Sequence, residues 1–420
     1  QWHSSNSPLL AMAFITSGRE KHRCGRLLIV LALFAPCCFV AGPGSPRPQH
    51  TKMAAPASPS SPAFSETDID DANFFEFVFN GDSFKEADRK YRRPVFGSPD
   101  WKKHRSSRRI TYNLSTVFSS RLFRAILFEV LLVVIVAVFA LIYYDPAFAA
   151  LAQQTFKDPN WKPFTTSLVP FTLTSFSLSL LLVFKTNSSY ARWWEARIIW
   201  GGIVNTSRDI VRQSLCRFQP KDNYLKEIMT GLATGYSKVL AFHLSDQTDE
   251  DKELLRTQLT NEMKLPEKDI EDIMSATHKP MTLNGKLSHY LEKADIDTFT
   301  KLHLDNALVK FSDFYGMCER IYKTPIPISY TRLTARFLSV WLLALPFALY
   351  KEVNPHWLIV PASVIISTFI FGIEELGVLI EEPFSVLPLQ KMADGIMGSC
   401  FEALEIDKKS WADSKQKSNA

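Results

Sequence analysis

The stretch FTLTSFSLSLLLVFKTNSSYARWWEAR, residues 171 to 197, decides how this chain folds. It starts as an apolar run that contains small hydroxyl side chains, and no charged residue occurs in it before Lys185. With the residues just before it, the run approaches the ~20 residues that a helix needs to cross a membrane. It ends in Trp193 and Trp194, which stand between an arginine and a glutamate. The stretch therefore predicts a membrane-spanning helix over residues 167 to 184, followed directly by a basic aromatic segment.

Three further stretches are also apolar enough to be membrane spans. They are Ala125 to Tyr143, Leu338 to Tyr350 extended by the preceding turn, and Trp357 to Ile380. The polar region between spans two and three shows the period of helices, for example over residues 297 to 322, and no long alternation typical of a strand. We therefore predict an all-α membrane protein with four transmembrane helices.

The charges of the connecting segments predict the orientation of these spans. Seven basic residues and no acid lie between Trp101 and Phe128, ahead of or at the start of span one. The loop from Asp145 to Thr166 carries two Lys and two Asp, whereas basic residues resume from Lys185 onward. Because strongly basic segments stay on one side of a membrane, both chain ends and the long polar region are expected on that same side.

These patterns divide the chain into six segments. They are a leader (1–65), a basic N-terminal segment (66–120), a first transmembrane hairpin (121–184), a helical polar domain (185–330), a second transmembrane hairpin (331–380) and a C-terminal segment (381–420).

The leader has the composition of an organelle transit peptide. It is rich in Ser, Pro and Ala, carries six Lys and Arg, and contains one acid, Glu20. Residues 27 to 41 also resemble the apolar core of a secretory signal, but Pro36 interrupts them and they are short for a span. The Ser and Pro content and the scarcity of acids favour import into a plastid.

The chain lacks recognisable catalytic and metal-binding motifs. It has no GxSxG, no HExxH and no Gly-rich phosphate loop, and its six cysteines form no CxxC pair, which favours free thiols. The histidines of the polar region (His243, His278, His289, His303) have no partner four residues away. A net charge of +5 is too small to indicate nucleic-acid binding. We predict no enzyme activity, no metal and no cofactor, so a conduit or transporter is the simplest remaining class.

Two pairs of acids lie near the end of span four. Glu374 and Glu375 stand seven residues before Glu381 and Glu382, so the two pairs are two turns apart on one helix face. Acids at membrane depth are functional candidates. The sequence leaves two interpretations open, a direct contact with an ion and an ion pair with the basic segments on the same side.

In span two, Phe176, Leu180 and Phe184 recur every fourth residue and form a row, called the apolar row below, down one helix face. Small hydroxyl residues, which allow helices to pack closely in a membrane, lie on a different face: Thr172, Ser175 and Ser179. Such a helix suits a ring of identical helices around an axis. A helix packed in an ordinary bundle explains the serines equally well, so the residues alone leave both arrangements open.

Three motifs occur in a specific order along the chain. They are YARWWEARIIWGG at residues 190 to 202, IPISYTRL at 326 to 333 and IEEPFSVLPL at 380 to 389. In these motifs, and over roughly residues 100 to 405, the chain resembles the bestrophin family, in particular its bacterial and plant branch. The acid-poor leader fits the plant members.

The resemblance implies a homopentamer in which five copies of span two enclose an anion pore, with the helical polar domain in the stroma. Aligned on the arginine and two tryptophans that begin RWWEAR, the apolar row falls at the narrow neck of that pore. Lys185 and Arg192 would attract anions near the mouth, and Trp193 and Trp194 would anchor the helix at the membrane boundary. After IEEPF no acid occurs until Asp394, so the Ca²⁺-binding cluster of animal members is not expected.

For function, the resemblance implies a voltage-dependent chloride channel of the chloroplast thylakoid membrane that balances light-driven proton pumping and adjusts the proton motive force. Its partners would be chloride and other monovalent anions, membrane lipid and further copies of the chain, with both termini in the stroma. The first rival interpretation is a proton-coupled anion transporter with Glu129 and Glu374 as proton carriers. The second is a non-conducting membrane scaffold.

Overall fold

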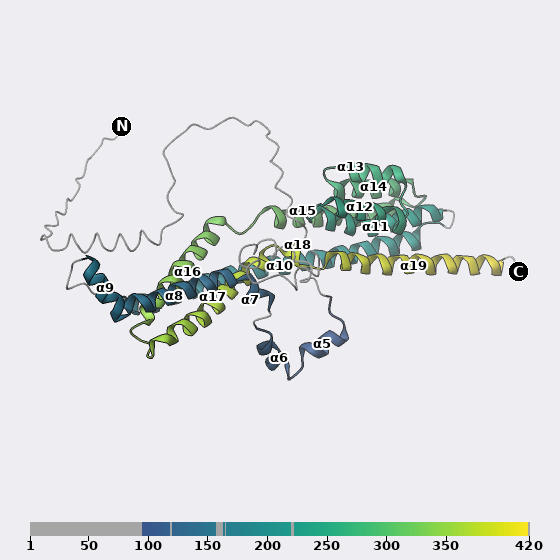
Figure 1. Ribbon diagram of the computed structural model, residues 1–420. Helices are drawn as coiled ribbons and strands as arrows, with labels where there is room; N and C mark the ends of the chain where they lie inside the picture. Colours follow the sequence, from purple (N-terminus) through teal and green to yellow (C-terminus); the bar gives the residue numbers. More distant parts are fainter. Residues whose placement is uncertain (1–94, 118–119, 157–162, 164, 220–221, 419–420) are drawn as a thin grey trace, which may run out of the picture. The chain divides into compact units, whose positions relative to one another are not determined.

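The computed structural model of the protein describes residues 95–117, 120–156, 163, 165–219 and 222–418, so the leader lies outside the described residues. Within these ranges all regular secondary structure is helical (Figure 1). The prediction of an all-α protein is therefore confirmed for this part of the chain.

The helices succeed one another with short connections. They are α5 (Ser98–His104), α6 (Arg109–Ser115), α7 (Arg121–Ala125), α8 (Leu127–Tyr144), α9 (Pro146–Phe156), α10 (Val169–Arg217), α11 (Asn223–His243), α12 (Asp249–Thr257), the π-helix η3 (Gln258–Glu262), α13 (Glu267–Ser275), α14 (Lys279–Lys293), α15 (Thr298–Lys323), α16 (Ile328–Leu349), the 3₁₀-helix η4 (His356–Leu358), α17 (Ile359–Glu381), α18 (Pro383–Val386) and α19 (Leu389–Ser418).

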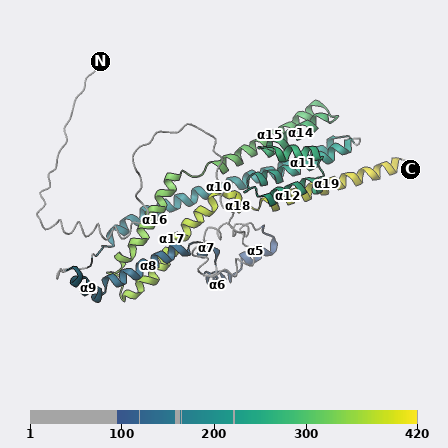
Figure 2. The same cartoon turned by 45° about the horizontal axis from the view of Figure 1, so that its top comes forward.

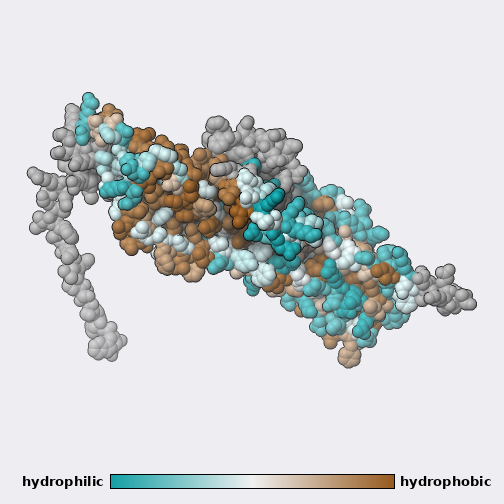
Figure 3. Space-filling view, turned by 90° about the horizontal axis from the view of Figure 1, so that it is seen from below, coloured by the Kyte–Doolittle hydropathy of each residue, from teal (hydrophilic) through white to brown (hydrophobic). Residues whose placement is uncertain are grey.

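Four candidate membrane spans occur among the described residues, which confirms the predicted number. They are carried by α8, by α10, by the continuous stretch of α15 and α16, and by η4 with α17. Helices α8 and α10 each pack against α16 and α17. Their shared apolar core contains Val130, Val133, Leu178, Leu182, Leu338, Leu342 and Phe371. On the face shown in Figure 3, brown apolar residues gather over one end of the protein and teal residues prevail over the other.

The start of the first hairpin lies close to the second hairpin in the structure. Helices α10 and α17 each continue from the membrane part toward the polar helices, and α16 begins directly after α15 (Figures 1 and 2). A Cβ placed on Gly372, in the second half of α17, would lie 3.8 and 4.0 Å from side-chain atoms of Leu122 and Ile126. Helix α7 and the start of α8 therefore lie beside the second half of α17.

Helix α10 is longer than the sequence predicts. We expected a span over residues 167 to 184 followed by a basic aromatic segment, but α10 is one helix of 49 residues, about 74 Å long at ~1.5 Å per residue. After Pro170 in its first turn it contains no proline, so nothing interrupts its backbone hydrogen bonds. One continuous element therefore joins the membrane part to the polar helices.

The polar domain has its own apolar core, built from α10, α11, α14, α15 and α19. Trp200, Tyr236 and Phe311 are fully buried in it. The rings of Tyr236 and Phe311 stack with their centroids 3.9 Å apart, and the tyrosine hydroxyl donates a hydrogen bond to the carbonyl of Phe311. Because stacked and hydrogen-bonded aromatic pairs fix side-chain geometry, α11 and α15 are held in a defined register.

Close packing of α11 gives a first testable prediction. A Cβ on Gly231 would lie 2.5 Å from the carbonyl oxygen of Met263, whereas a Cβ on Gly316, within α15, would meet nothing within 4 Å. We expect Gly231→Ala to destabilise the protein by about 1–3 kcal/mol through overpacking. The matched change Gly316→Ala should stabilise it by about 0.5–1 kcal/mol, because alanine is the better helix former. Thermal unfolding in detergent measures both, and equal shifts would contradict the close contact at Gly231.

Candidate functional site

The apolar row lies outside the core of the protein's own helices. Phe176, Leu180 and Phe184 are 75%, 41% and 54% exposed, whereas Leu178 and Leu182 on another face of the same helix are buried among α8, α16 and α17. Exposed aromatic and aliphatic side chains on a membrane-crossing helix are available to lipid, to another copy of the chain or to a pore. The structure thus leaves the row available, in the single chain, for the role predicted for it.

The hydroxyl residues of α10 are not confined to a packed face. Thr172 and Ser179 are exposed, and Ser175 is half-buried. Thr172 donates to the carbonyl of Val169 at 2.9 Å, and Ser175 donates to the carbonyl of Thr172 at 2.7 Å. These side chains satisfy their hydrogen bonds within α10 itself, so they can face a neighbouring helix or lipid without leaving a polar group unpaired.

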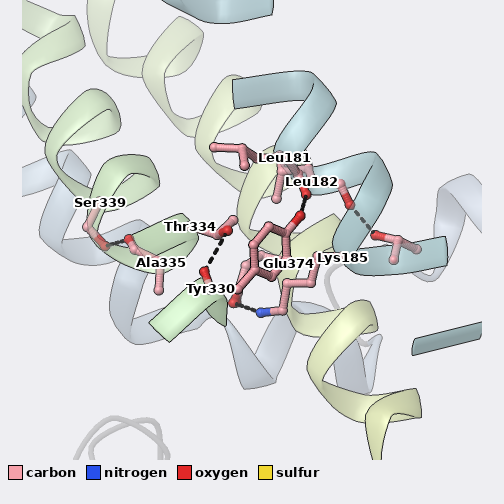
Figure 4. A network of polar contacts seen from close by, with 9 residues as sticks. Leu181, Leu182, Lys185, Tyr330, Thr334, Ala335, Ser339 and Glu374 are labelled. Atoms are coloured by element: carbon pink, nitrogen blue, oxygen red, sulfur yellow. Dashed lines mark hydrogen bonds and ion pairs between the residues drawn. The ribbon is translucent and has the colours of Figure 1, made fainter. Parts of the chain in front are cut away.

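Lys185 lies inside the protein rather than at an open mouth, in contrast to the sequence prediction. It directly follows the apolar row and is fully buried, and its ammonium pairs with the carboxylate of Glu374 on α17 (Figure 4). A Cβ on Gly377 would lie 3.8 Å from two carbons of the lysine side chain. An ammonium enclosed with a carboxylate offers little net charge to a passing anion. Its position indicates that it fixes α10 against α17.

The pairing also answers the question left open for the acids of span four. Of the two interpretations, the contact of Glu374 is an ion pair with a base that follows span two. Glu381 contributes differently, because its carboxylate accepts a hydrogen bond from the backbone N–H of Ile326 at 3.1 Å. Both acids therefore connect α17 to neighbouring segments.

A small cavity lies next to this ion pair. Its volume is about 160 Å³, and it is lined by Ile126, Glu129, Ala335, Leu338, Ser339, Phe371, Glu374 and Glu375. Three carboxylates from α8 and α17 thus meet one cavity between the membrane helices. Glu129 and Glu374, which the transporter interpretation names as proton carriers, both line this cavity.

The motif IPISYTRL supplies contacts that sequence reasoning did not assign. The Tyr330 hydroxyl donates to the carbonyl of Leu181 at 2.9 Å, one turn before Lys185, and Thr334 donates to the carbonyl of Tyr330 at 3.0 Å (Figure 4). Nearer the start of α10, the indole of Trp341, which follows the motif on α16, donates to the hydroxyl of Thr174 at 3.1 Å. Tyr330 of the motif and Trp341 therefore both hold α16 against the helix that carries the apolar row.

Arg192 also makes its hydrogen bonds inside the protein, in contrast to its predicted role of attracting anions. Its guanidinium donates to the carbonyls of Ile321 at 2.7 Å, Thr324 at 2.6 Å and Glu381 at 3.0 Å. These carbonyls stand at the C-terminal ends of α15 and α17, where backbone acceptors lack helical partners and the helix dipole is negative. Arg192 therefore caps two helix ends and joins them to α10.

The two tryptophans that follow lie in different surroundings. Trp193 is half-buried and packs against the core of the polar domain, whereas Trp194 is 50% exposed. Their rings are 6.3 Å apart, and Trp193 is 5.8 Å from the ring of Tyr190. The exposed face of Trp194 is consistent with contact to the membrane boundary, where amphipathic aromatic rings accumulate.

Comparison with known proteins agrees with this architecture. A family profile described as "Bacterial/Fungal Bestrophin protein" matches residues 100–402. Voltage-dependent chloride channel 1, chloroplastic, of Arabidopsis thaliana is 32% identical over 334 residues, which cover 78% of this chain and 77% of that one. A voltage-dependent anion channel-forming protein of Synechocystis is 29% identical over 258 residues, 58% of this chain and 78% of that protein.

Solved structures share the fold. A crystal structure of a mutant bacterial bestrophin homologue from Klebsiella pneumoniae matches with a TM-score of 0.58 at 24% identity, covering 68% of this chain and 99% of that chain. The family profile spans the membrane helices and the polar domain together, and the three motifs that suggested the resemblance all contain residues that join α10 to neighbouring helices. The chain therefore belongs to the bestrophin family.

Proposed function

We propose that this protein is a chloride-conducting anion channel of the chloroplast thylakoid membrane. The observation that carries the proposal is the exposed apolar row on α10, in a chain that is 32% identical to a chloroplastic voltage-dependent chloride channel. In this proposal five copies of the chain form a ring, and the rows of their α10 helices enclose a narrow neck. The leader acts as the plastid transit peptide, and both termini lie in the stroma.

The chemistry of the row suits weakly hydrated anions. An apolar constriction penalises any ion that must shed water, and chloride, bromide or nitrate lose less hydration free energy there than strongly hydrated ions do. The edges of phenylalanine rings carry the positive part of the ring quadrupole, so Phe176 and Phe184 turned edge-on would favour an anion over a cation. Lys185 and Arg192 support this neck by fixing α10 in place.

Chloride movement would serve the energetics of the membrane in which the channel sits. Proton pumping into the lumen builds a voltage, and a chloride current dissipates this voltage while the proton gradient remains. The described helices contain no array of arginines at every third position, which a voltage-sensor helix requires. Voltage dependence is therefore assigned to ions within the neck or to motion of the segments around it.

One observation favours a second function, that of a proton-coupled anion transporter. Glu129, Glu374 and Glu375 line one cavity at membrane depth, and carboxylates in such places form proton relays in transporters. Glu374, however, is held in an ion pair with Lys185 that joins α17 to α10. For this reason the channel is the function that the geometry supports better.

Current recordings from the purified protein in planar bilayers distinguish the functions. We expect unitary anion currents that reverse at the chloride equilibrium potential, about 59 mV for a tenfold chloride gradient, whatever the pH difference. A reversal potential that moves with the pH gradient would identify the coupled transporter. If the purified, folded protein carries no current, the non-conducting membrane scaffold is the remaining interpretation.

The pentamer is tested separately by native mass spectrometry. The detergent-free complex should weigh five times the mass of the denatured chain from the same sample. A complex of single chains would contradict the enclosed neck, because one α10 cannot surround a pore.

A further inference from the structure

Three side chains far apart in sequence converge in the polar domain. His243 is the last residue of α11, His278 directly precedes α14, and Glu319 lies in the last two turns of α15. One ligand atom from each, a ring nitrogen of either histidine and a carboxylate oxygen, lies within 4.8 Å of the other two. No local spacing reveals this cluster, because the three residues come from three different helices.

A tyrosine oxygen completes the group. The Tyr315 hydroxyl lies 2.8 Å from Nδ1 of His278, 3.4 Å from Nε2 of His243 and 3.3 Å from Oε1 of Glu319. Donor atoms around a tetrahedral ion with bonds of ~2.1 Å stand roughly 3.4 Å apart. The distances from the tyrosine oxygen to the other three donor atoms, 2.8 to 3.4 Å, are therefore close to those of a fourth ligand in a tetrahedral site.

Charged side chains from neighbouring elements lie close to the cluster. Two cations face the group: Lys323 pairs with Glu319, and Lys279 donates to the carbonyl of Ala276. The Lys323 side chain is 62% exposed and can turn into solvent when another cation binds Glu319.

We propose that His243, His278 and Glu319 form a binding site for a divalent transition metal of the Zn²⁺ class, with Tyr315 at the fourth position. Two imidazoles and a carboxylate are donors that Zn²⁺ accepts, whereas Ca²⁺ requires six to eight oxygens. Because the three atoms lie within 4.8 Å of one another, some point lies within about 2.8 Å of all of them, and side-chain shifts below about 1 Å bring an ion there to Zn²⁺ bond lengths.

The consequence of binding follows from the position of α15. An ion at this site joins the end of α11, the start of α14 and the last turns of α15. Ile321, two residues after Glu319, is one of the residues whose carbonyl Arg192 of α10 holds. A bound ion therefore braces the polar domain against the helix that carries the apolar row, whether or not the protein conducts anions.

Metal binding to the full-length protein in detergent tests the proposal. After removal of metal with a chelator, ZnCl₂ is titrated into the wild type and into His278→Ala, Glu319→Gln and His303→Ala. Zinc affinity is measured by calorimetry and the unfolding midpoint by a thermal scan. His278 is exposed, so its replacement should not disturb folding, and exposed His303 on α15 is the matched control. The same proteins are loaded with Co²⁺, whose visible absorption reports tetrahedral coordination.

We expect one tight zinc site per chain in the wild type, with a raised unfolding midpoint and a tetrahedral Co²⁺ spectrum. His278→Ala and Glu319→Gln should each weaken that site by about 100-fold or more, since even outer residues around a metal contribute about 10- to 100-fold. His303→Ala should bind like the wild type. Absence of a tight site in the wild type, or unchanged binding in His278→Ala, would overturn the proposal and leave the cluster as a hydrogen-bonded hub around Tyr315.

Discussion

Replacing Phe176 or Phe184 by alanine is expected to raise the unitary chloride conductance of the purified protein about tenfold. Each phenylalanine occurs once per chain, so one substitution removes five rings from the neck of a pentamer. A wider neck lets an anion keep more of its hydration water, and a barrier lowered by about 1.4 kcal/mol corresponds to a tenfold faster passage. Single-channel recording in symmetric chloride measures the change directly.

The same substitution should weaken selectivity for anions. Because the ring edges offer the positive part of the quadrupole, their loss removes an attraction for anions and leaves only the width of the neck. Reversal potentials in a potassium chloride gradient should therefore move toward zero in Phe176→Ala. Leu180→Ala should raise conductance with a smaller change in selectivity, since leucine has no quadrupole.

Thr172 and Ser179 provide the matched controls. They lie on the same helix at comparable depth and are exposed in the single chain, as the apolar row is. Alanine at either position removes a hydroxyl that bonds within α10 or lies exposed, so conductance should stay near the wild-type value. Equal changes in both sets of variants would show that the row does not form the neck.

The membrane architecture could be predicted because its physics is local. A run of apolar residues with the length of a bilayer specifies a span whatever it packs against, and the excess of bases ahead of residue 125 orients it. The continuity of α10 was not predicted because the apolar run that marks the span ends at Phe184 and polar residues follow it. Lys185 and Ser189 are in fact buried against other helices, and this burial depends on partners that lie far away in the sequence.

The ion pairs and hydrogen bonds that charged side chains make inside the protein were the least predictable feature. Glu374 and Lys185 are separated by 189 residues, and their sequence neighbours reveal only that both lie near the same membrane boundary. Arg192 was assigned to the mouth because it follows the span, yet its hydrogen bonds go to two helix ends whose positions the sequence does not specify. The cluster of His243, His278 and Glu319 likewise arises from tertiary packing.

The ion pair between Lys185 and Glu374 leads to the second large effect. Glu374→Ala should destabilise the protein by about 3–5 kcal/mol, because it leaves the fully buried ammonium without its partner. We expect a clearly lower unfolding midpoint in detergent and a loss of anion current as α10 shifts against α17. The exposed pair of Arg212 and Asp209, with side chains 63% and 55% exposed, is the control. Asp209→Ala should change the stability by about 1 kcal/mol or less.

A double variant separates the destabilisation caused by an unpaired buried charge from the stabilisation that the ion pair itself provides. Lys185→Met with Glu374→Leu removes both charges and keeps apolar volume at both positions, so most of the stability lost in Glu374→Ala should return. If α10 then regains its place against α17, anion current should return with it, because the lysine holds the helix and does not attract the ion. A double variant that is stable but carries no current would instead give the Lys185 ammonium a direct part in conduction. A double variant as unstable as Glu374→Ala would mean that the charged pair itself specifies this helix contact.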